Sequence, residues 1–158
     1  MDKHLKNGRK RKANEINEKI VSIGILTSEE FYSIDNFQSG IAEYLALRNA
    51  KIYCFTGNEK IPKISSPYFF EKDFNWKGNV LRSDLQKFLN TRFDLLIGFF
   101  PKKHLFLEYT SILSSASFKV GFAGIHPQLF DLEIMTSVEN LDGFFFELQK
   151  YLKILNKL

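Results

Sequence analysis

The chain has 158 residues, of which 44% are hydrophobic and 25% charged, and its formal net charge is +4. These values are typical of one folded domain and exclude wholesale disorder. No apolar run reaches the roughly 18 residues of a membrane span, and the polar, basic N-terminus is not that of a secretory signal peptide. The single cysteine, Cys54, excludes an intramolecular disulfide and a multi-cysteine metal site, so we expect a cytoplasmic protein.

The net charge comes from the N-terminus. Residues 1–19 hold seven basic and three acidic side chains, and the rest of the chain holds fifteen of each. We therefore predict a basic arm over 1–19 and a single domain over 20–158. Such an arm is typical of a solvated leader, and the alternative is a tether for RNA or the ribosome. In that alternative the phosphate contacts come from Lys6, Arg9, Lys10, Arg11 and Lys12. No membrane contact is expected, because the arm has no apolar face.

The first half of the chain alternates strand and helix patterns. Residues 20–26 are short, apolar and β-branched, which predicts a buried strand. A helix is expected from Asp35, which has a glutamine three residues later as in a capping box, to about Asn49. Residues 51–55 predict a second strand, in which Cys54 is structural and buried rather than reactive.

The middle of the chain is less regular. Within residues 58–80, the segment 68–70 is a candidate short strand. The segment 74–76, which contains the single tryptophan, is expected to be a loop anchored by its aromatic side chains. A short helix follows, with Ser83 as its N-cap.

The second half continues the alternation. Residues 93–100 are almost continuously apolar, which predicts a parallel strand covered on both faces. A helix to about Ser115 follows, with inward-facing residues Leu105, Tyr109, Ile112 and Leu113. Further strands are expected at 118–122 and 132–135. Ser137 is expected to cap a last helix, whose inward stripe is Leu141, Phe144, Phe145, Leu148, Leu152 and Leu155.

Together these elements predict an α/β fold. The alternation indicates a single three-layer Rossmann-like domain, with a mostly parallel sheet of about five strands and helices on both faces. Most of the 17 phenylalanines fall in apolar runs, which favours core packing over a stacking surface for nucleic acid. Phe146 and Tyr151 lie off the core face of the last helix, where a protein partner or a second copy of the chain could bind.

Sequence motifs for cofactors and catalysis are missing. No glycine-rich dinucleotide or P-loop fingerprint follows the first strand, and no G-x-S-x-G nucleophile elbow occurs. The histidines His4, His104 and His126 do not have the spacing of metal ligands. We therefore expect no cofactor, no metal and no catalytic residues.

A ligand could still bind at the carboxyl ends of the strands, where open parallel sheets place their sites. The polar residues expected there are Thr27, Ser28, Glu29, Lys102, Lys103, His104 and His126. Lys102, Lys103 and His104 are expected to open a helix, whose N-terminus favours an anion such as a phosphate. The alternative is that these are ordinary polar loop residues.

Short segments of the second half of the chain resemble two known families. The segments Phe93-Asp94-Leu95-Leu96-Ile97, Leu113-Ser114-Ser115-Ala116 and Phe118-Lys119-Val120-Gly121-Phe122 resemble the N-terminal half of heptosyltransferase-type glycosyltransferases. Those enzymes bind a sugar nucleotide in a second, C-terminal domain, so transfer by this chain alone is not expected. The first and third of these segments, together with the chain's ending Tyr151–Lys157, are also similar to a family of short uncharacterised bacterial proteins. This resemblance implies a cytoplasmic bacterial protein and no particular activity.

The sequence leaves three functions open. The first is a non-catalytic binding or accessory domain that contacts RNA, the ribosome or a protein partner. The second is a small enzyme or sensor that binds a phosphorylated metabolite or nucleotide-sugar at the carboxyl edge of the sheet. The third is a structural protein that acts as a homodimer through its last helix.

Overall fold

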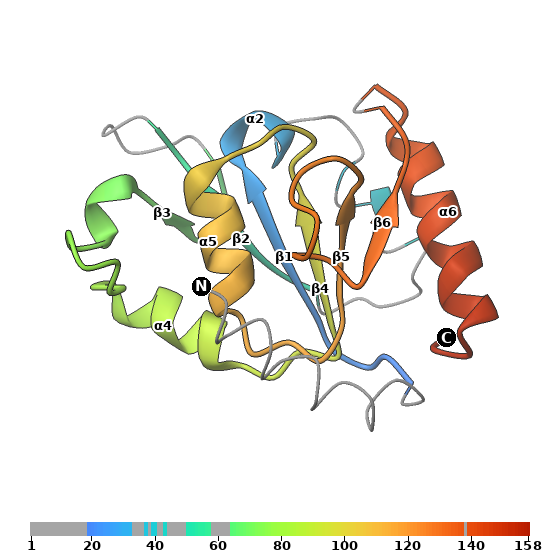
Figure 1. The fold of residues 1–158 in the computed structure, drawn as a ribbon, viewed down its shortest axis with the longest axis horizontal. Coiled ribbons are helices and arrows are strands. Elements are labelled where there is room, and N and C mark those ends of the chain that lie inside the picture. Colours follow the sequence, from blue (N-terminus) through green and yellow to red (C-terminus); the bar gives the residue numbers. More distant parts are fainter. Residues whose placement is uncertain are drawn as a thin grey trace.

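The sheet is fully parallel. The computed structural model describes residues 19–32, 37, 39, 40, 43, 50–57, 64–137 and 139–158. In this part of the chain six strands form one sheet in the order β3-β2-β1-β4-β5-β6, as Figure 1 shows. The strands are β1 (Ile23–Ser28), β2 (Lys51–Phe55), β3 (Tyr68–Phe69), β4 (Leu95–Phe99), β5 (Lys119–Phe122) and β6 (Leu132–Ile134). The predicted α/β class is confirmed, with six strands instead of about five.

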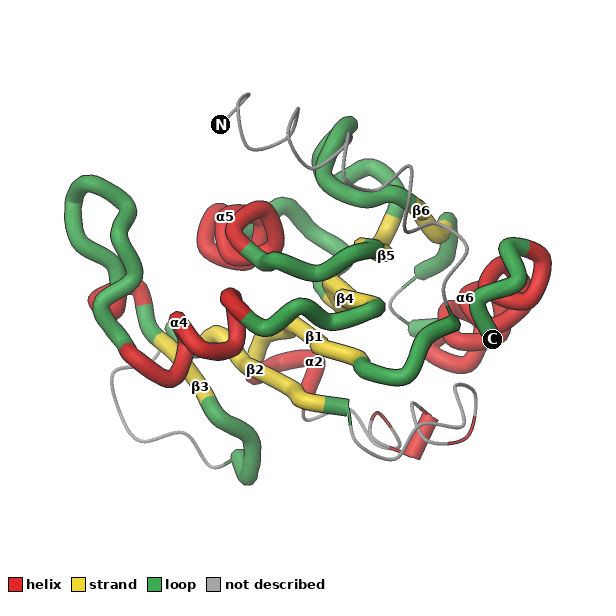
Figure 2. Tube along the Cα trace, turned by 90° about the horizontal axis from the view of Figure 1, so that it is seen from below, coloured by secondary structure: helices red, strands yellow, loops and turns green. Residues whose placement is uncertain are grey.

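Helices cover both faces of the sheet. They are α2 (Glu29–Tyr32), α4 (Ser83–Asn90), α5 (Leu105–Leu113) and α6 (Leu141–Ile154), with a 3-10 turn η1 (Glu71–Asp73). In Figure 2, α4 and α5 lie on one face, and α2 and α6 lie on the other. We call these the α5 face and the α6 face.

The strand order creates a switch point between β1 and β4. These two strands are neighbours, with Thr27 in register with Phe99. The chain leaves β1 towards the α6 face and leaves β4 towards the α5 face, so the two loops diverge at the carboxyl edge (Figure 2). The order 3-2-1-4-5-6 is that of Rossmann folds, which place ligands at this point.

Phenylalanine packing forms the core on the α6 face. The ring of Phe99 on β4 lies 5.0 Å from that of Phe37 and 5.1 Å from those of Phe122 and Phe144. Phe31 of α2 meets the same ring edge-on, with the centroids 6.2 Å apart. The prediction that the phenylalanines serve core packing is confirmed by their burial.

Two glycines shape the α5 face. Gly98 and Gly121 are in register on β4 and β5. The ring of Phe130, from the loop between β5 and β6, covers both, so that a Cβ atom would come within 2.7 Å of it at Gly98 and 2.2 Å at Gly121. This loop therefore packs directly on the sheet, because the two strands carry no side chains there.

Several element boundaries differ from the prediction. The first strand begins at Ile23 rather than at residue 20. Ser83 is the first residue of α4, and Arg82 before it is the N-cap without a side-chain bond. Ser137 does not cap the last helix. Asn140 does, accepting a bond from the Gly143 N–H at 3.0 Å.

The inward stripes are only partly as expected. Phe144, Phe145, Leu148 and Leu152 of α6 are buried, whereas Leu155 follows the last helical residue and is exposed. On α5, Ile112 is buried. The prediction that Leu105 faces inward is wrong, because Leu105 is the first residue of the helix and is 71% exposed.

The start of the body is bound to the end of the chain. The ammonium of Lys19 donates to the Asn156 side chain and to the Leu158 carbonyl, both at 2.8 Å. The Ile20 N–H donates to the Lys157 carbonyl at 2.9 Å. Lys19 is thus held by the body. The rest of the predicted arm, and the expected cap Asp35, lie outside the described residues.

Candidate functional site

The topology brings together most of the polar residues expected at the carboxyl edge. Thr27, Ser28 and Glu29 end β1 and begin α2, and residues 101–104 follow the neighbouring strand β4. His126 follows β5, the next strand along the sheet. The switch point thus lies between the start of α2, which has two glutamates, and a loop with two exposed lysines, Lys102 and Lys103.

The hydroxyls at this edge mostly serve the fold. Buried Thr27 donates from Oγ1 to the Phe99 carbonyl at 2.8 Å, which joins β1 to β4. Thr56, buried after β2, donates from Oγ1 to Glu29 Oε2, also at 2.8 Å. The Ser28 Oγ is different: within the described ranges it is buried and has no hydrogen-bond partner.

His104 is engaged by the start of α5. Its Nδ1 accepts from the Leu107 N–H at 3.2 Å, and its own N–H donates to Glu108 Oε2 at 2.7 Å. The ring meets Phe55 edge-on, with the centroids 4.5 Å apart. Burial lowers the pKa of His104 below 6.5, which favours the neutral ring that the cap needs.

The start of α5 differs from the prediction, and the anion site at this edge stays a prediction. The helix begins at Leu105, so Lys102 and Lys103 precede it and do not form its first turn. The side chain of the N-cap His104 occupies the Leu107 N–H, which is one of the N-terminal donors that an anion would use. His126, further along the edge, accepts from the Gln128 N–H at 3.3 Å inside its own loop.

The described residues show no arrangement for nucleophilic or metal chemistry. Cys54 is buried, as predicted, and burial raises the pKa of its thiol to about 11. Within the described ranges, no three His, Cys, Asp or Glu side chains are grouped so that they could hold a metal ion. What the carboxyl edge offers chemically is hydrogen bonding and charge, not an activated nucleophile.

A second candidate site follows β3, the outermost strand on one side of the sheet. It is the turn of residues 74–80, which we call the Trp76 turn. Phe74 is half-buried and its ring lies 5.5 Å from that of Phe106 on α5. Trp76, in contrast, is 90% exposed. The prediction that both aromatic side chains anchor the loop is therefore correct for Phe74 and wrong for Trp76.

Hydrogen bonds hold the Trp76 turn in one shape. Asn75 Oδ1 accepts from the N–H groups of Lys77 and Asn79 at 3.0 and 2.8 Å. The Gly78 N–H donates to the Asn75 carbonyl at 2.9 Å, and Gly78 has a φ of +82°, which favours glycine. The Tyr109 hydroxyl of α5 donates to the Gly78 carbonyl at 2.7 Å. The turn is thus fixed to the body although its tryptophan points outwards.

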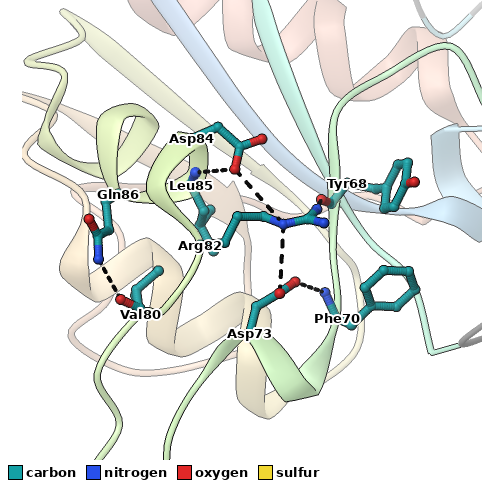
Figure 3. A network of polar contacts seen from close by, with 8 residues as sticks. All are labelled: Tyr68, Phe70, Asp73, Val80, Arg82, Asp84, Leu85 and Gln86. Carbon is teal, nitrogen blue, oxygen red and sulfur yellow. Dashed lines mark hydrogen bonds and ion pairs between the residues drawn. The ribbon is translucent and has the colours of Figure 1, made fainter.

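A polar network holds the base of the turn, as Figure 3 shows. The Arg82 guanidinium donates to the Tyr68 carbonyl and lies 3.6 Å from Asp73 and 3.8 Å from Asp84. Asp73 also accepts from the Phe70 N–H at 2.7 Å. These bonds occupy the backbone groups on the outer edge of β3, which would otherwise be free to pair with another strand.

Cations lie over the aromatic rings of this region. Lys77 Nζ lies 5.2 Å from the Trp76 ring centroid, and Lys72 Nζ lies 5.1 Å from that of Phe70. Both lysines are exposed. The sequence contained a signal for this site, since Asn75 and Gly78 are turn residues on either side of a tryptophan and a lysine. Their pattern did not show on which side of the turn the ring would lie.

The fold and the two sites define a Rossmann-like α/β domain without a glycine-rich phosphate loop. The chain belongs to a family of unknown function, DUF6913, whose model matches residues 1–155. No curated protein and no solved structure gives a significant match. None of the helices in the described ranges has the length and apolar character that crossing a membrane requires. Membership of an uncharacterised family is confirmed, while bacterial origin and the heptosyltransferase resemblance stay predictions.

Proposed function

We propose that this protein is a non-catalytic binding domain and that its partner docks on the Trp76 turn. The observation that carries the proposal is the 90% exposure of Trp76 on a turn whose backbone is held by hydrogen bonds at Lys77, Gly78 and Asn79. Tryptophan is enriched among the residues that dominate binding energy at interfaces. A turn that is already ordered loses little conformational freedom when a partner binds.

The state of the polar groups at the carboxyl edge supports a non-catalytic role. Thr27, Thr56 and His104 each make hydrogen bonds that hold strands or helix ends together. A general base has to lie within hydrogen-bond reach of a reacting group, and His104 already uses Nδ1 as a helix cap. Of the site residues expected from the sequence, Thr27 and His104 are thus better explained as parts of the scaffold.

The alternative function, binding of a phosphorylated metabolite or nucleotide-sugar at the switch point, has one observation in its favour. Among the residues that the structure describes, the buried Ser28 Oγ has no hydrogen-bond partner, and such a group costs free energy unless something binds it. A ligand that binds only the folded state raises the melting temperature. A rise with such compounds that Ser28→Ala abolishes would therefore favour this alternative over the Trp76 turn.

Site-specific cross-linking in cells that express the chain tests the main proposal. Photoreactive benzoylphenylalanine is incorporated in place of Asn79, whose side chain is exposed on the Trp76 turn. The matched control position is Met135, which is equally exposed just after β6 at the opposite edge of the sheet. Digestion with protease or nuclease then shows which kind of molecule is attached.

The proposal expects adducts from position 79 that disappear when Trp76→Ala is added, and none of the same kind from position 135. Adducts from position 79 that persist with Trp76→Ala would overturn it, as would their complete absence. The homodimer through α6 stays a prediction, and Phe146 is exposed as expected. The cytoplasmic location stays a prediction too.

A further inference from the structure

We infer that the Trp76 turn binds single-stranded nucleic acid, with one base stacked on the Trp76 ring and its phosphates at Lys77 and Lys72. This inference rests on the proposed function and names the chemistry of the partner. It assigns a site on the folded body, separate from the basic arm.

The pairing of an exposed ring with an ammonium group is the first argument. Trp76 is 90% exposed, so its ring has an open surface for a flat partner. Lys77 Nζ lies 5.2 Å from the centroid of the same ring. Aromatic rings beside lysine or arginine are what single-strand binding proteins use, because the ring stacks on a base while the cation meets the phosphate.

The charge distribution along the body is the second argument. Residues 71–92 hold five basic and three acidic side chains, whereas residues 20–70 and 93–158 each hold one more acidic than basic side chain. Two of those three acids, Asp73 and Asp84, face the Arg82 guanidinium in Figure 3. The segment around Trp76 is therefore the net basic segment of the body, and the charge of Arg82 offsets that of one of these two acids.

The neighbouring η1 extends the same chemistry. Lys72 is exposed and its Nζ lies 5.1 Å from the Phe70 ring centroid. The Leu81 N–H donates to the Asp73 carbonyl at 2.7 Å, which ties η1 to the segment between the Trp76 turn and α4. Two exposed lysines thus lie on one hydrogen-bonded unit with the tryptophan, on either side of it in the sequence, and each can meet a phosphate group.

These features favour a single strand over the other partners. In a duplex the base faces are hidden in the stack, whereas an unpaired base can leave it and stack on a side chain. A protein partner would gain most from apolar neighbours around the anchor, and exposed lysines are depleted at such interfaces. Because stacking does not read base identity, little sequence preference is expected.

Titration of the full chain with short oligonucleotides tests the inference. Trp76 is the only tryptophan, so its fluorescence reports directly on this turn. Anisotropy of labelled oligonucleotides gives the affinity independently. The ligands are single-stranded RNA and single-stranded DNA of equal length, which separate the two sources of this chemistry, and the corresponding RNA duplex. The titrations are run over a salt series.

Four variants divide the binding between the turn and the arm. Trp76→Ala removes the ring, and Trp76→Phe keeps a ring that can stack. Lys77→Ala removes one expected phosphate contact. The full-length K6Q/R9Q/K10Q/R11Q/K12Q chain neutralises the arm and leaves the body intact.

The inference expects single strands to quench the Trp76 emission and to bind more tightly than the duplex. Trp76→Ala should weaken binding about tenfold, and Trp76→Phe should recover most of that loss. Lys77→Ala should lower the slope of log affinity against log salt by about 0.7. The arm variant should still show quenching, because the ring and Lys77 are unchanged.

Two results would overturn the inference. In the first, single strands bind but Trp76→Ala has the same affinity, and neutralising the arm removes the binding. In the second, no oligonucleotide binds at about 50 mM salt, where phosphate contacts are strong. If the adducts at position 79 then depend on Trp76 and resist nuclease, the proposed function stands and only the nucleic-acid inference fails. If those adducts are also absent, both fail.

Discussion

At the amino edge of the sheet, the side chains of Ser22 and Asp94 hydrogen-bond to each other, and each also accepts from the backbone of the other residue. Ser22 Oγ accepts from the Asp94 N–H at 3.0 Å and donates to Asp94 Oδ2 at 3.2 Å. Asp94 Oδ2 also accepts from the N–H groups of Val21 and Ser22 at 2.9 and 3.0 Å. Next to it, Phe93 packs where a side chain at Gly24 would be, 2.7 Å from an added Cβ. The Phe-Asp pair before β4 therefore sets the pairing of β1 and β4, and is structural.

Removing this carboxylate should destabilise the fold. Asp94→Ala leaves three donors without their acceptor, and we expect a loss of about 2–3 kcal/mol in the free energy of unfolding. Asp94→Asn should lose less, because its amide oxygen still accepts. Urea denaturation of both variants measures the two losses. Equal stability of wild type and Asp94→Ala would contradict the structural role.

The cap on α5 should make stability depend on pH. The pKa of His104 is lowered by burial when folded, so the unfolded chain binds the proton more tightly. The contribution of the neutral cap is therefore present above the ordinary pKa of 6.5 and is lost as the pH falls from there through the folded value. We expect a fall in melting temperature between about pH 7 and pH 5.

His104→Asn is the matched control for this prediction. Asparagine is a good N-cap and does not titrate. The variant should lose part of the pH dependence seen in the wild type between about pH 7 and pH 5. If both proteins lose stability equally over this range, other groups cause the change.

The Arg82 network should protect the edge of the sheet. Arg82→Ala removes the donor to the Tyr68 carbonyl and leaves the outer edge of β3 open. We expect about 1–2 kcal/mol lower stability and increased self-association. Light scattering against concentration measures the association. Lys87→Ala, an exposed change on α4, serves as control and should alter neither property.

Gly121 should not tolerate a side chain. A Cβ atom would come 2.2 Å from the Phe130 ring, so Gly121→Ala is expected to cost about 1–3 kcal/mol. In a Phe130→Leu background the cost should be smaller, because the ring has gone. A double-mutant cycle of unfolding free energies measures the coupling. Additive costs would show that the two positions do not compete for this space.

Trp76 should be dispensable for folding. Its side chain is 90% exposed, so Trp76→Ala should change the unfolding free energy by less than about 0.5 kcal/mol. Chemical denaturation followed by circular dichroism measures this, since the fluorescent residue is missing. A large loss would mean that the ring supports the fold and is not kept for a partner.

The sequence predicted the fold class better than the site, for physical reasons. Strong apolar runs such as 93–100 show burial directly, so the parallel strands and the buried Cys54 could be recognised. Helix starts were missed where several capping residues compete, as Ser137 and Asn140 do, because tertiary contacts decide between them. The neighbouring positions of β1 and β4 depend on strand order, which no local pattern encodes.

The Trp76 turn shows the same limit more sharply. Its turn residues were visible in the sequence, but the side on which the tryptophan lies depends on Tyr109 and Arg82, which come from other elements. Lys102 and Lys103 were expected to begin a helix, and the cap formed by His104 placed them outside it. Local pattern thus predicted the elements, but neither the cap at His104 nor the hydrogen bond that reaches the Trp76 turn from α5.

The most direct test of the account is the affinity of Trp76→Ala for single-stranded RNA, measured beside that of the wild type by anisotropy at low salt. The account predicts binding by the wild type and a loss of about tenfold in the variant, with unfolding free energies that agree within about 0.5 kcal/mol. Equal affinities of two equally stable proteins would contradict it.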